Sequence, residues 1–154
     1  MYAADERRIE EPEQRVRLAE SPLCAADVEA LVRDPAFGAA VTFAGVVRAF
    51  SRERRILYLE YEAYRPLAIK RIEELIAEAE VRWRVRCAIA HRLGRIEIGE
   101  ASVIVAVGAV HRAEAFESCG WLMDSLKDTV PIWKKEFAED GAYWVEGPST
   151  APSL

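Results

Sequence analysis

The alternation of apolar and polar residues predicts two kinds of strand in the first half of the chain. The segment Gly38 to Val47 is a nearly unbroken apolar run with β-branched residues, and its length fits a buried strand. Between Ile56 and Tyr64 the pattern alternates strictly. Leu57, Leu59 and Tyr61 are therefore expected on one face of a half-buried strand.

Helical spacing of apolar residues predicts three helices. Pro66 can begin a helix that runs to about Arg82, with an apolar face formed by Ile69, Ile72, Leu75, Ile76 and Ala79. A second helix is expected from about Ala113 to Asp128, with an apolar side formed by Phe116, Cys119, Met123 and Leu126. A shorter helix from about Ala25 to Arg33 ends at Asp34-Pro35, because the residue before a proline is pushed out of the α region.

Residues 102–110 predict a central strand that is apolar on both faces. The other apolar segments predict short strands, at about residues 15–19, 85–89, 132–137 and 143–145. Residues 49–55 are polar and are expected to form an exposed loop, and Gly94 a turn. Strands that follow one another directly indicate a partly antiparallel sheet, which gives an α+β fold. We expect one domain over residues 15–147, a flexible charged leader over residues 1–14 and a C-terminal tail over residues 148–154.

Composition narrows the classes of function. The 154 residues are 51% hydrophobic, enough for one sizeable core. The net charge of -5 argues against non-specific binding to nucleic acid, which needs an excess of cations. No apolar run reaches the roughly 18 residues of a membrane span, and the N-terminus lacks the apolar stretch of a signal peptide, so a cytoplasmic protein is expected. The three cysteines show no CxxC spacing, which argues against a disulfide scaffold or a zinc site, and they are expected to pack in the core.

Positively charged residues gather where predicted elements end, the positions at which such folds usually form their sites. His111 and Arg112 fall between an apolar strand and the helix that follows it. Backbone N–H groups there favour anions, and a guanidinium adds a bidentate phosphate ligand. Lys127 lies near the other end of that helix, Lys134 follows in a later strand, and Arg48 ends an earlier one. Each residue alone also fits a structural role, so pattern and charge predict an anion pocket and name no reaction.

Five longer segments add a more specific signal: TFAGVVR (residues 42–48), LEYEAY (59–64), HRLGRIEIGEASVIVAV (91–107), HRAEAFESCGWLMDSLKDTVPIWKKE (111–136) and WVEG (144–147). In this order they resemble the large subunits of molybdopterin synthase, the MoaE family. The resemblance covers roughly residues 16–147, nearly the whole chain.

The resemblance implies an α/β hammerhead-type fold with an added antiparallel β subdomain. It also implies a homodimer of large subunits within a heterotetramer. The implied partner is a small ubiquitin-like sulfur carrier whose C-terminal thiocarboxylate enters a pocket of the large subunit. The implied substrate is cyclic pyranopterin monophosphate, which receives two sulfurs to form the dithiolene of molybdopterin. The resemblance implies no cofactor and no metal.

Site residues follow from the same motifs, as implications of the resemblance. The family's two essential lysines match Lys127, expected to stabilise charge on the acyl oxygen, and Lys134, expected to stabilise the phosphate as its ring opens. The positions that bind the substrate phosphate and the pterin match Arg48, His111 and Arg112, with further pocket positions at Glu136 and Phe43. Two features depart from some members, which have a lysine where Val46 stands and an Asn/His-rich composition over residues 49–55.

Two other classes of protein remain open at this stage. One is a docking module that receives a ubiquitin-like tail without turnover, although such a module has no need of both Lys127 and Lys134. The other is a phosphodiesterase-type hydrolase that uses His111 and glutamates. The sequence has only two histidines and no paired Asp motif, which disfavours the hydrolase.

Overall fold

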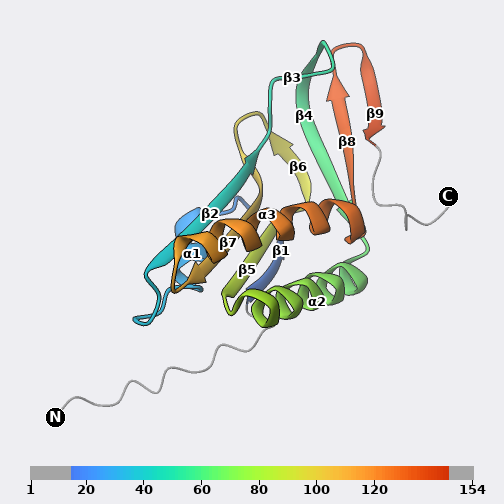
Figure 1. The fold of residues 1–154 in the computed structure, drawn as a ribbon. Coiled ribbons are helices and arrows are strands. Elements are labelled where there is room, and N and C mark those ends of the chain that lie inside the picture. Colours follow the sequence, from blue (N-terminus) through green and yellow to red (C-terminus); the bar gives the residue numbers. More distant parts are fainter. Residues whose placement is uncertain (1–14, 146–154) are drawn as a thin grey trace.

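The computed structural model describes residues 15–145 (Figure 1). The expected leader, residues 1–14, and the expected tail, residues 148–154, lie outside the described residues. The described elements are, in chain order, β1 (Val16–Ala19), α1 (Ala25–Ala30), β2 (Ala39–Val46), β3 (Phe50–Ser51), β4 (Arg54–Ala63), α2 (Arg65–Trp83), β5 (Arg86–Arg92), β6 (Gly94–Glu97), β7 (Ala101–Ala109), α3 (Arg112–Thr129), β8 (Ile132–Ala138) and β9 (Gly141–Val145).

The main sheet has the strand order β1-β5-β7-β2. β1 is parallel to β5, and the other neighbours are antiparallel. Helices α2 and α3 cover one face of this sheet and α1 covers the other (Figure 1). Strand β7 is buried on both faces, as the sequence predicts, because it lies inside the sheet with helices on both sides.

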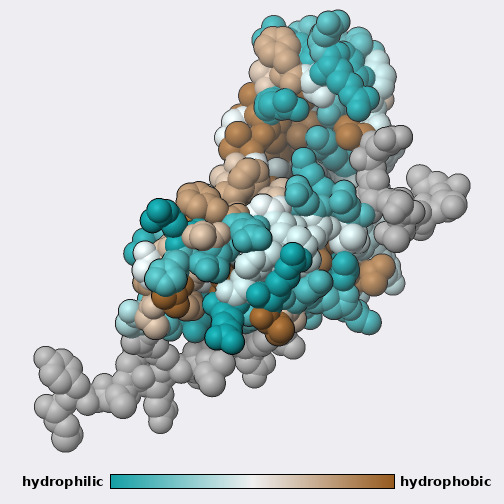
Figure 2. Space-filling model, in the orientation of Figure 1, coloured by the Kyte–Doolittle hydropathy of each residue, from teal (hydrophilic) through white to brown (hydrophobic). Residues whose placement is uncertain are grey.

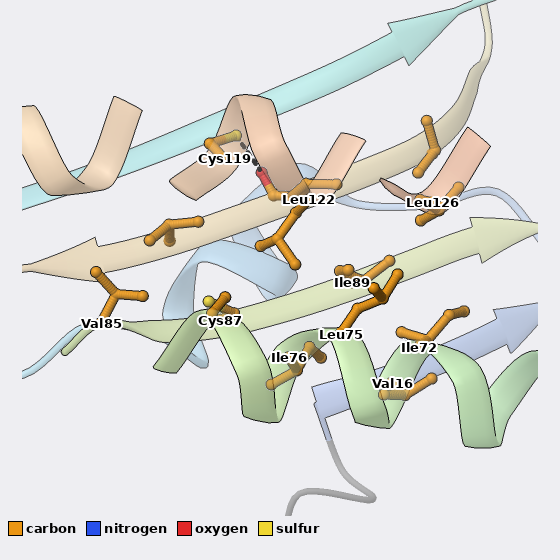
Figure 3. Close-up of a cluster of buried hydrophobic side chains, with 14 of the residues drawn as sticks. Val16, Ile72, Leu75, Ile76, Val85, Cys87, Ile89, Cys119, Leu122 and Leu126 are labelled. Atoms are coloured by element: carbon orange, nitrogen blue, oxygen red, sulfur yellow. Dashed lines mark hydrogen bonds between the residues drawn. The ribbon is translucent and has the colours of Figure 1, made fainter. Parts of the chain in front are cut away.

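The larger core fills the space between the sheet and the helices α2 and α3 (Figure 3). Its fully buried members include Ile72 and Leu75 from α2, Leu122 from α3, and Ile89 and Val105 from the sheet. Burying each such side chain stabilises the fold by roughly 1.5–3 kcal/mol. This packing explains why the 3.6-residue periodicity of both long helices predicts their extent so closely.

A smaller core lies under α1, on the opposite face of the sheet. Val28 and Val32 pack there against Ala88, Ala90, Ile104 and Ala106. Gly108 allows this close approach, because a Cβ at that position would lie 2.0 Å from the carbonyl oxygen of Val32.

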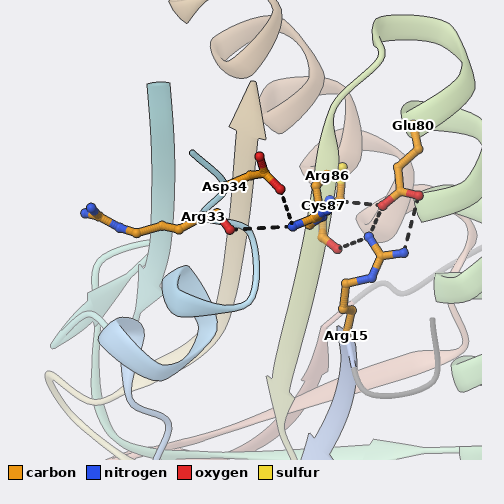
Figure 4. Close-up of polar contacts among 6 residues, drawn as sticks. All are labelled: Arg15, Arg33, Asp34, Glu80, Arg86 and Cys87. Atoms are coloured by element: carbon orange, nitrogen blue, oxygen red, sulfur yellow. Dashed lines mark hydrogen bonds and ion pairs between the residues drawn. The ribbon is translucent and has the colours of Figure 1, made fainter. Parts of the chain in front are cut away.

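Charged side chains tie the helices to the beginning of β5 (Figure 4). Arg15 pairs with Glu80 of α2 and donates to the carbonyl oxygen of Cys87 at 3.3 Å. Glu80 also accepts the backbone N–H of Cys87 at 3.2 Å. Arg86 points the other way and pairs with Asp34 at 3.5 Å. The polar contacts thus fix both faces of the sheet at the end where β7 leads into α3.

The second sheet is antiparallel and rises from the main body (Figure 1). Its strand order is β3-β4-β8-β9, and β6 also pairs with β4. A third cluster of buried residues fills the junction of the two sheets, formed by Val47, Ile56, Leu59, Ile96 and Ala138. The α+β fold and the additional antiparallel subdomain are therefore confirmed.

One expectation about local structure in this subdomain was wrong, and another was incomplete. Residues 49–55 form no simple loop, because β3 and the start of β4 pair as a hairpin around Arg52 and Glu53. Gly94 does more than turn the chain, since it opens the short strand β6. Neither strand has enough alternating apolar residues to reveal itself in the sequence.

The apolar run of β2 suggested a buried strand, but β2 is an edge strand whose only partner among residues 15–145 is β7. Phe43 is 41% exposed and Val46 56% exposed. Figure 2 shows hydrophobic side chains gathered on the surface between the main body and the subdomain. An apolar sequence indicates a surface that is covered, but it does not tell whether the same chain or another chain covers that surface.

Four single residues also differ from expectation. Ile69, expected on the apolar face of α2, is 36% exposed. Leu57 is 47% exposed, because a bulge between Ile56 and Tyr58 shifts the register and turns Ile56 inward instead. Phe116 is 64% exposed, since the buried side of α3 is formed by Ala115, Ser118, Cys119, Leu122 and Leu126. Cys24 is exposed, whereas Cys87 and Cys119 are buried as expected. No helix in the described range, 15–145, is long and apolar enough to cross a membrane.

A candidate anion site at the junction of the two sheets

Three elements bring the predicted cations Arg48, Lys127 and Lys134 together. Strand β2 runs antiparallel to β7, and α3 returns along the same sheet after β7 ends. The end of β2 and the C-terminal end of α3 therefore fall at the same side of the molecule. Pro131 then separates α3 from β8, which carries Lys134.

Lys134 is the most perturbed of these groups. Its side chain is 32% exposed. Burial lowers the pKa of Lys134 below its usual value, while Glu136 raises it and the positive charges of Lys127, Arg48 and Arg52 lower it. This coupling places Lys127, Arg48 and Arg52 near the Lys134 ammonium.

Glu136 supplies the negative charge within this cluster. Glu136 is only 3% exposed. It lies on the same face of β8 as Lys134, which precedes it by two residues. Its Oε1 accepts a hydrogen bond from the Ser51 hydroxyl at 3.1 Å and lies 3.8 Å from the Lys134 ammonium. Its Oε2 lies 3.6 Å from the Arg54 guanidinium. Glu136 thus ties the hairpin between β3 and β4 to the strand that carries Lys134.

Arg48 and Lys127 have no ion-pair partner within residues 15–145, and both are exposed. Lys127 lies in the last turn of α3, where the helix dipole favours a cation. With one carboxylate among several cations, the cluster carries an excess of positive charge. Such a site binds anions, and its lysines and arginines can stabilise charge that develops on oxygen.

Phe43 lies on β2, five residues before Arg48. Its ring extends along the strand over Gly45, where a Cβ would meet the ring at 3.5 Å and Val103 at 2.9 Å. The small residue leaves room for the exposed ring on the side of β2 that leads to Arg48. Phe43 is therefore an exposed aromatic side chain on the strand that leads to Arg48.

His111 and Arg112 lie elsewhere in the same chain. His111 is the N-cap of α3 and Arg112 its first residue, whereas Lys127 is in the last turn. Fifteen residues of helix at 1.5 Å each separate Arg112 from Lys127 by about 22 Å. The single pocket expected from the sequence is therefore not assembled within one chain. Both residues are exposed at the end of β7, next to Gly38, whose N–H donates to the carbonyl of Val110 at 3.2 Å.

Sequence reasoning missed Arg52, Ser51 and Arg54. All three lie in the segment expected to be a loop. The hairpin lacks the Asn-Gly or Asp-Gly pair that would have predicted a tight turn. The available signal was the sequence SRERR, in which two polar residues, Arg52 and Glu53, separate two short segments that could pair as strands.

The fold and the site together define an α+β protein with a cationic anion-binding site. Within residues 15–145, no group of three or more His, Cys, Asp or Glu side chains is placed to hold a metal ion. The nearby side chains are lysines, arginines, a glutamate and an aromatic ring. Such residues bind, position and neutralise anionic groups.

Comparison with known proteins identifies the family. Residues 18–129 match the family described as MoaE protein. The molybdopterin synthase catalytic subunit of Halalkalibacterium halodurans is 41% identical over 133 residues, covering 86% of this chain and 85% of the relative. Catalytic subunit 1 of Mycobacterium tuberculosis is 42% identical over 130 residues, covering 84% and 88%. The crystal structure of molybdopterin synthase from Staphylococcus aureus superposes with a TM-score of 0.83 at 32% identity, covering 86% of this chain and 97% of that one.

The chain therefore belongs to the MoaE family of molybdopterin synthase catalytic subunits. The family, the fold and the enzyme class that the sequence motifs implied are confirmed.

Proposed function

We propose that this enzyme transfers sulfur from the C-terminal thiocarboxylate of a small ubiquitin-like carrier to cyclic pyranopterin monophosphate, in the cytoplasm. The observation that carries the proposal is the cluster of Arg48, Lys127 and Lys134. The reaction brings two anions together, and two like charges 4 Å apart repel by about 4 kcal/mol at an effective dielectric constant near 20. Cations between the thiocarboxylate and the phosphate offset that repulsion.

The nucleophile in this reaction belongs to the carrier, so the chain needs no catalytic cysteine. Burial raises the pKa of both Cys87 and Cys119, which keeps these thiols protonated. The exposed Cys24 lies at the N-cap of α1, on the other face of the main sheet from α3. The cysteines thus fit a chain that binds a sulfur donor rather than one that carries sulfur.

The chemical step divides between the two lysines. The carrier's sulfur forms a C–S bond at a carbon of the substrate, and the C–O bond at that carbon breaks, so that its oxygen leaves either on the opened phosphate or as water. Water then cleaves the acyl–sulfur bond, which leaves sulfur on the substrate and a carboxylate on the carrier. Lys127 stabilises the negative charge on the acyl oxygen. Lys134, whose pKa is lowered chiefly by burial, stabilises the phosphate as its ring opens and is a better proton donor than an exposed lysine.

A second copy of the chain supplies His111 and Arg112 in this proposal. These residues are about 22 Å from Lys127 along α3, too far to share one small substrate. A homodimer with two-fold symmetry can bring the N-terminus of one α3 to the C-terminal end of the other.

The free edge of β2 offers a route to that arrangement. Residues 39–46 contain neither a charge nor a proline, the devices that normally protect an edge strand from pairing. Two β2 strands that pair antiparallel place the beginning of one beside the end of the other. His111 follows β7 next to the beginning of β2, and Arg48 follows its end. His111 and Arg112 of the second copy would thus face Arg48 and hold the substrate phosphate.

Reconstitution tests the proposed reaction. The purified protein is mixed with a thiocarboxylated carrier and cyclic pyranopterin monophosphate, and the dithiolene product is measured. Lys127→Ala and Lys134→Ala are expected to lose on the order of 100-fold in rate or more while still binding the carrier. Lys135→Ala is the matched control, because Lys135 lies on the opposite face of β8, near Phe137 and Trp144.

The competing classes predict different results in the same assay. A docking module would bind the carrier and yield no product with the wild-type chain. A metal-dependent hydrolase would release phosphate only with a divalent metal, whereas sulfur transfer is expected to persist in a chelator.

A further inference from the structure

The hairpin between β3 and β4 has an unusual backbone at its tip. Ser51 pairs with Arg54, so Arg52 and Glu53 form a two-residue turn. Both have positive φ, 49° and 66°. Turns of this kind normally contain glycine or asparagine, because other side chains are disfavoured there. A strained turn built from two charged residues persists only where its surroundings hold it in place.

Glu136 and Tyr143 hold this hairpin. The Glu136 carboxylate contacts Ser51 on one side of the turn, at 3.1 Å, and Arg54 on the other, at 3.6 Å. The Arg54 guanidinium also lies 3.8 Å from the centroid of the Tyr143 ring. Because Glu136 is buried on the strand that carries Lys134, these contacts fix the tip of the hairpin relative to the site.

The two arginines of the hairpin differ in their charge environment. Arg54 is neutralised by Glu136. Arg52 has no ion-pair partner in the described part of the chain. It follows Ser51, whose hydroxyl lies 3.1 Å from the same Glu136 oxygen that lies 3.8 Å from the Lys134 ammonium, and its positive charge lowers the pKa of Lys134. The hairpin therefore adds a fourth cation to the site, without a carboxylate to neutralise it.

We propose that Arg52 is a specificity-determining residue that binds the phosphate of the substrate. The assignment rests on the proposed sulfur transfer. Opening of the cyclic phosphate increases its charge from one to two, so the site needs one more cation at the end of the reaction than at the beginning. A guanidinium fixed on a rigid turn contacts two phosphate oxygens at once, which a lysine cannot do.

A titration with inorganic phosphate, followed by NMR, tests this contact without any turnover. Arg52→Gln is expected to weaken phosphate binding roughly tenfold, and Arg52→Lys to restore part of the loss. Arg55→Gln is the matched control, because Arg55 lies on the same hairpin, is 64% exposed and pairs with Glu139. Equal phosphate binding by Arg52→Gln and Arg55→Gln would overturn the proposal.

Kinetics of the reconstituted enzyme then identify the ligand. Arg52→Gln is expected to raise the KM for cyclic pyranopterin monophosphate about tenfold and to leave the KM for the carrier unchanged. A rise confined to the KM for the carrier would overturn the assignment, since Arg52 would then contact the carrier's tail. If the wild-type enzyme binds phosphate through Arg52 but makes no product, sulfur transfer itself fails, and the substrate assignment falls with it.

Discussion

Acid is expected to destabilise this protein through one buried histidine. His91 is 4% exposed, and its ring packs edge-on against Tyr61 with a centroid distance of 4.9 Å. Burial lowers the pKa of His91 from 6.5 to about 4, although a hydrogen bond between Nδ1 and the Arg92 carbonyl oxygen raises it. At a pH between the pKa of the unfolded state and that of the folded state, His91 binds a proton in the unfolded chain and not in the folded chain. Stability is therefore complete above pH 6.5 and is lost as the pH falls toward 4.

The size of the effect follows from the same two pKa values, 6.5 and about 4. The full difference corresponds to about 3 kcal/mol, and about 2 kcal/mol of it is lost between pH 8 and pH 5. Urea unfolding at both pH values measures the change. His91→Gln is expected to remove most of this dependence, whereas His111→Gln, which alters the exposed second histidine, keeps it.

Two results would refute this reasoning. The free energy of unfolding of the wild type could stay constant from pH 8 to pH 5, or His91→Gln could lose as much as the wild type. An NMR titration of the folded protein gives an independent check, because the His91 ring is expected to show no protonation above pH 5.

Two further predictions concern the backbone. Gly108→Ala is expected to destabilise the fold by about 3 kcal/mol or more in urea unfolding. The new Cβ would lie 2.0 Å from the carbonyl oxygen of Val32 and push α1 off the sheet. An unchanged unfolding midpoint would contradict this packing. Arg84 ends α2 in the left-handed conformation, with φ 53°. Arg84→Gly is therefore expected to raise the free energy of unfolding by about 1 kcal/mol, whereas Arg84→Ala is not. Equal effects of the two substitutions would rule out relief of strain.

The sequence predicts the main elements of this fold because their periodicity reflects burial. The helix of residues 66–82 packs on the sheet, and the central strand of residues 102–110 lies between helices on both faces, so the spacing of their apolar residues predicts both elements. Strands β3 and β6 escaped prediction since they are short and partly polar. The position of β2 at the edge of the sheet escaped prediction, because an apolar sequence does not tell whether a strand lies inside a sheet or at its edge.

The candidate site could be predicted in part. Motif resemblance selected Arg48, Lys127 and Lys134, and the fold brings these three cations together. The expected helix already placed Arg112 and Lys127 at its opposite ends, as the structure has them. The motif could not show whether two residues so far apart share one pocket, because it records order along the chain and not distance in space. Arg52 was missed for a different reason: its place in the site depends on the contacts of Glu136 with the hairpin, which join residues far apart in sequence.

The central claim is that each site combines residues of two copies, and complementation tests it most directly. Arg112→Ala and Lys127→Ala chains, with different affinity tags, are co-expressed, and the mixed dimers are isolated by purification on both tags. One of the two sites in a mixed dimer then has both residues intact, so about half of the wild-type activity is expected, while each variant alone is nearly inactive. Mixed dimers no more active than the single variants would contradict the claim and place Arg112 and Lys127 in sites of the same chain.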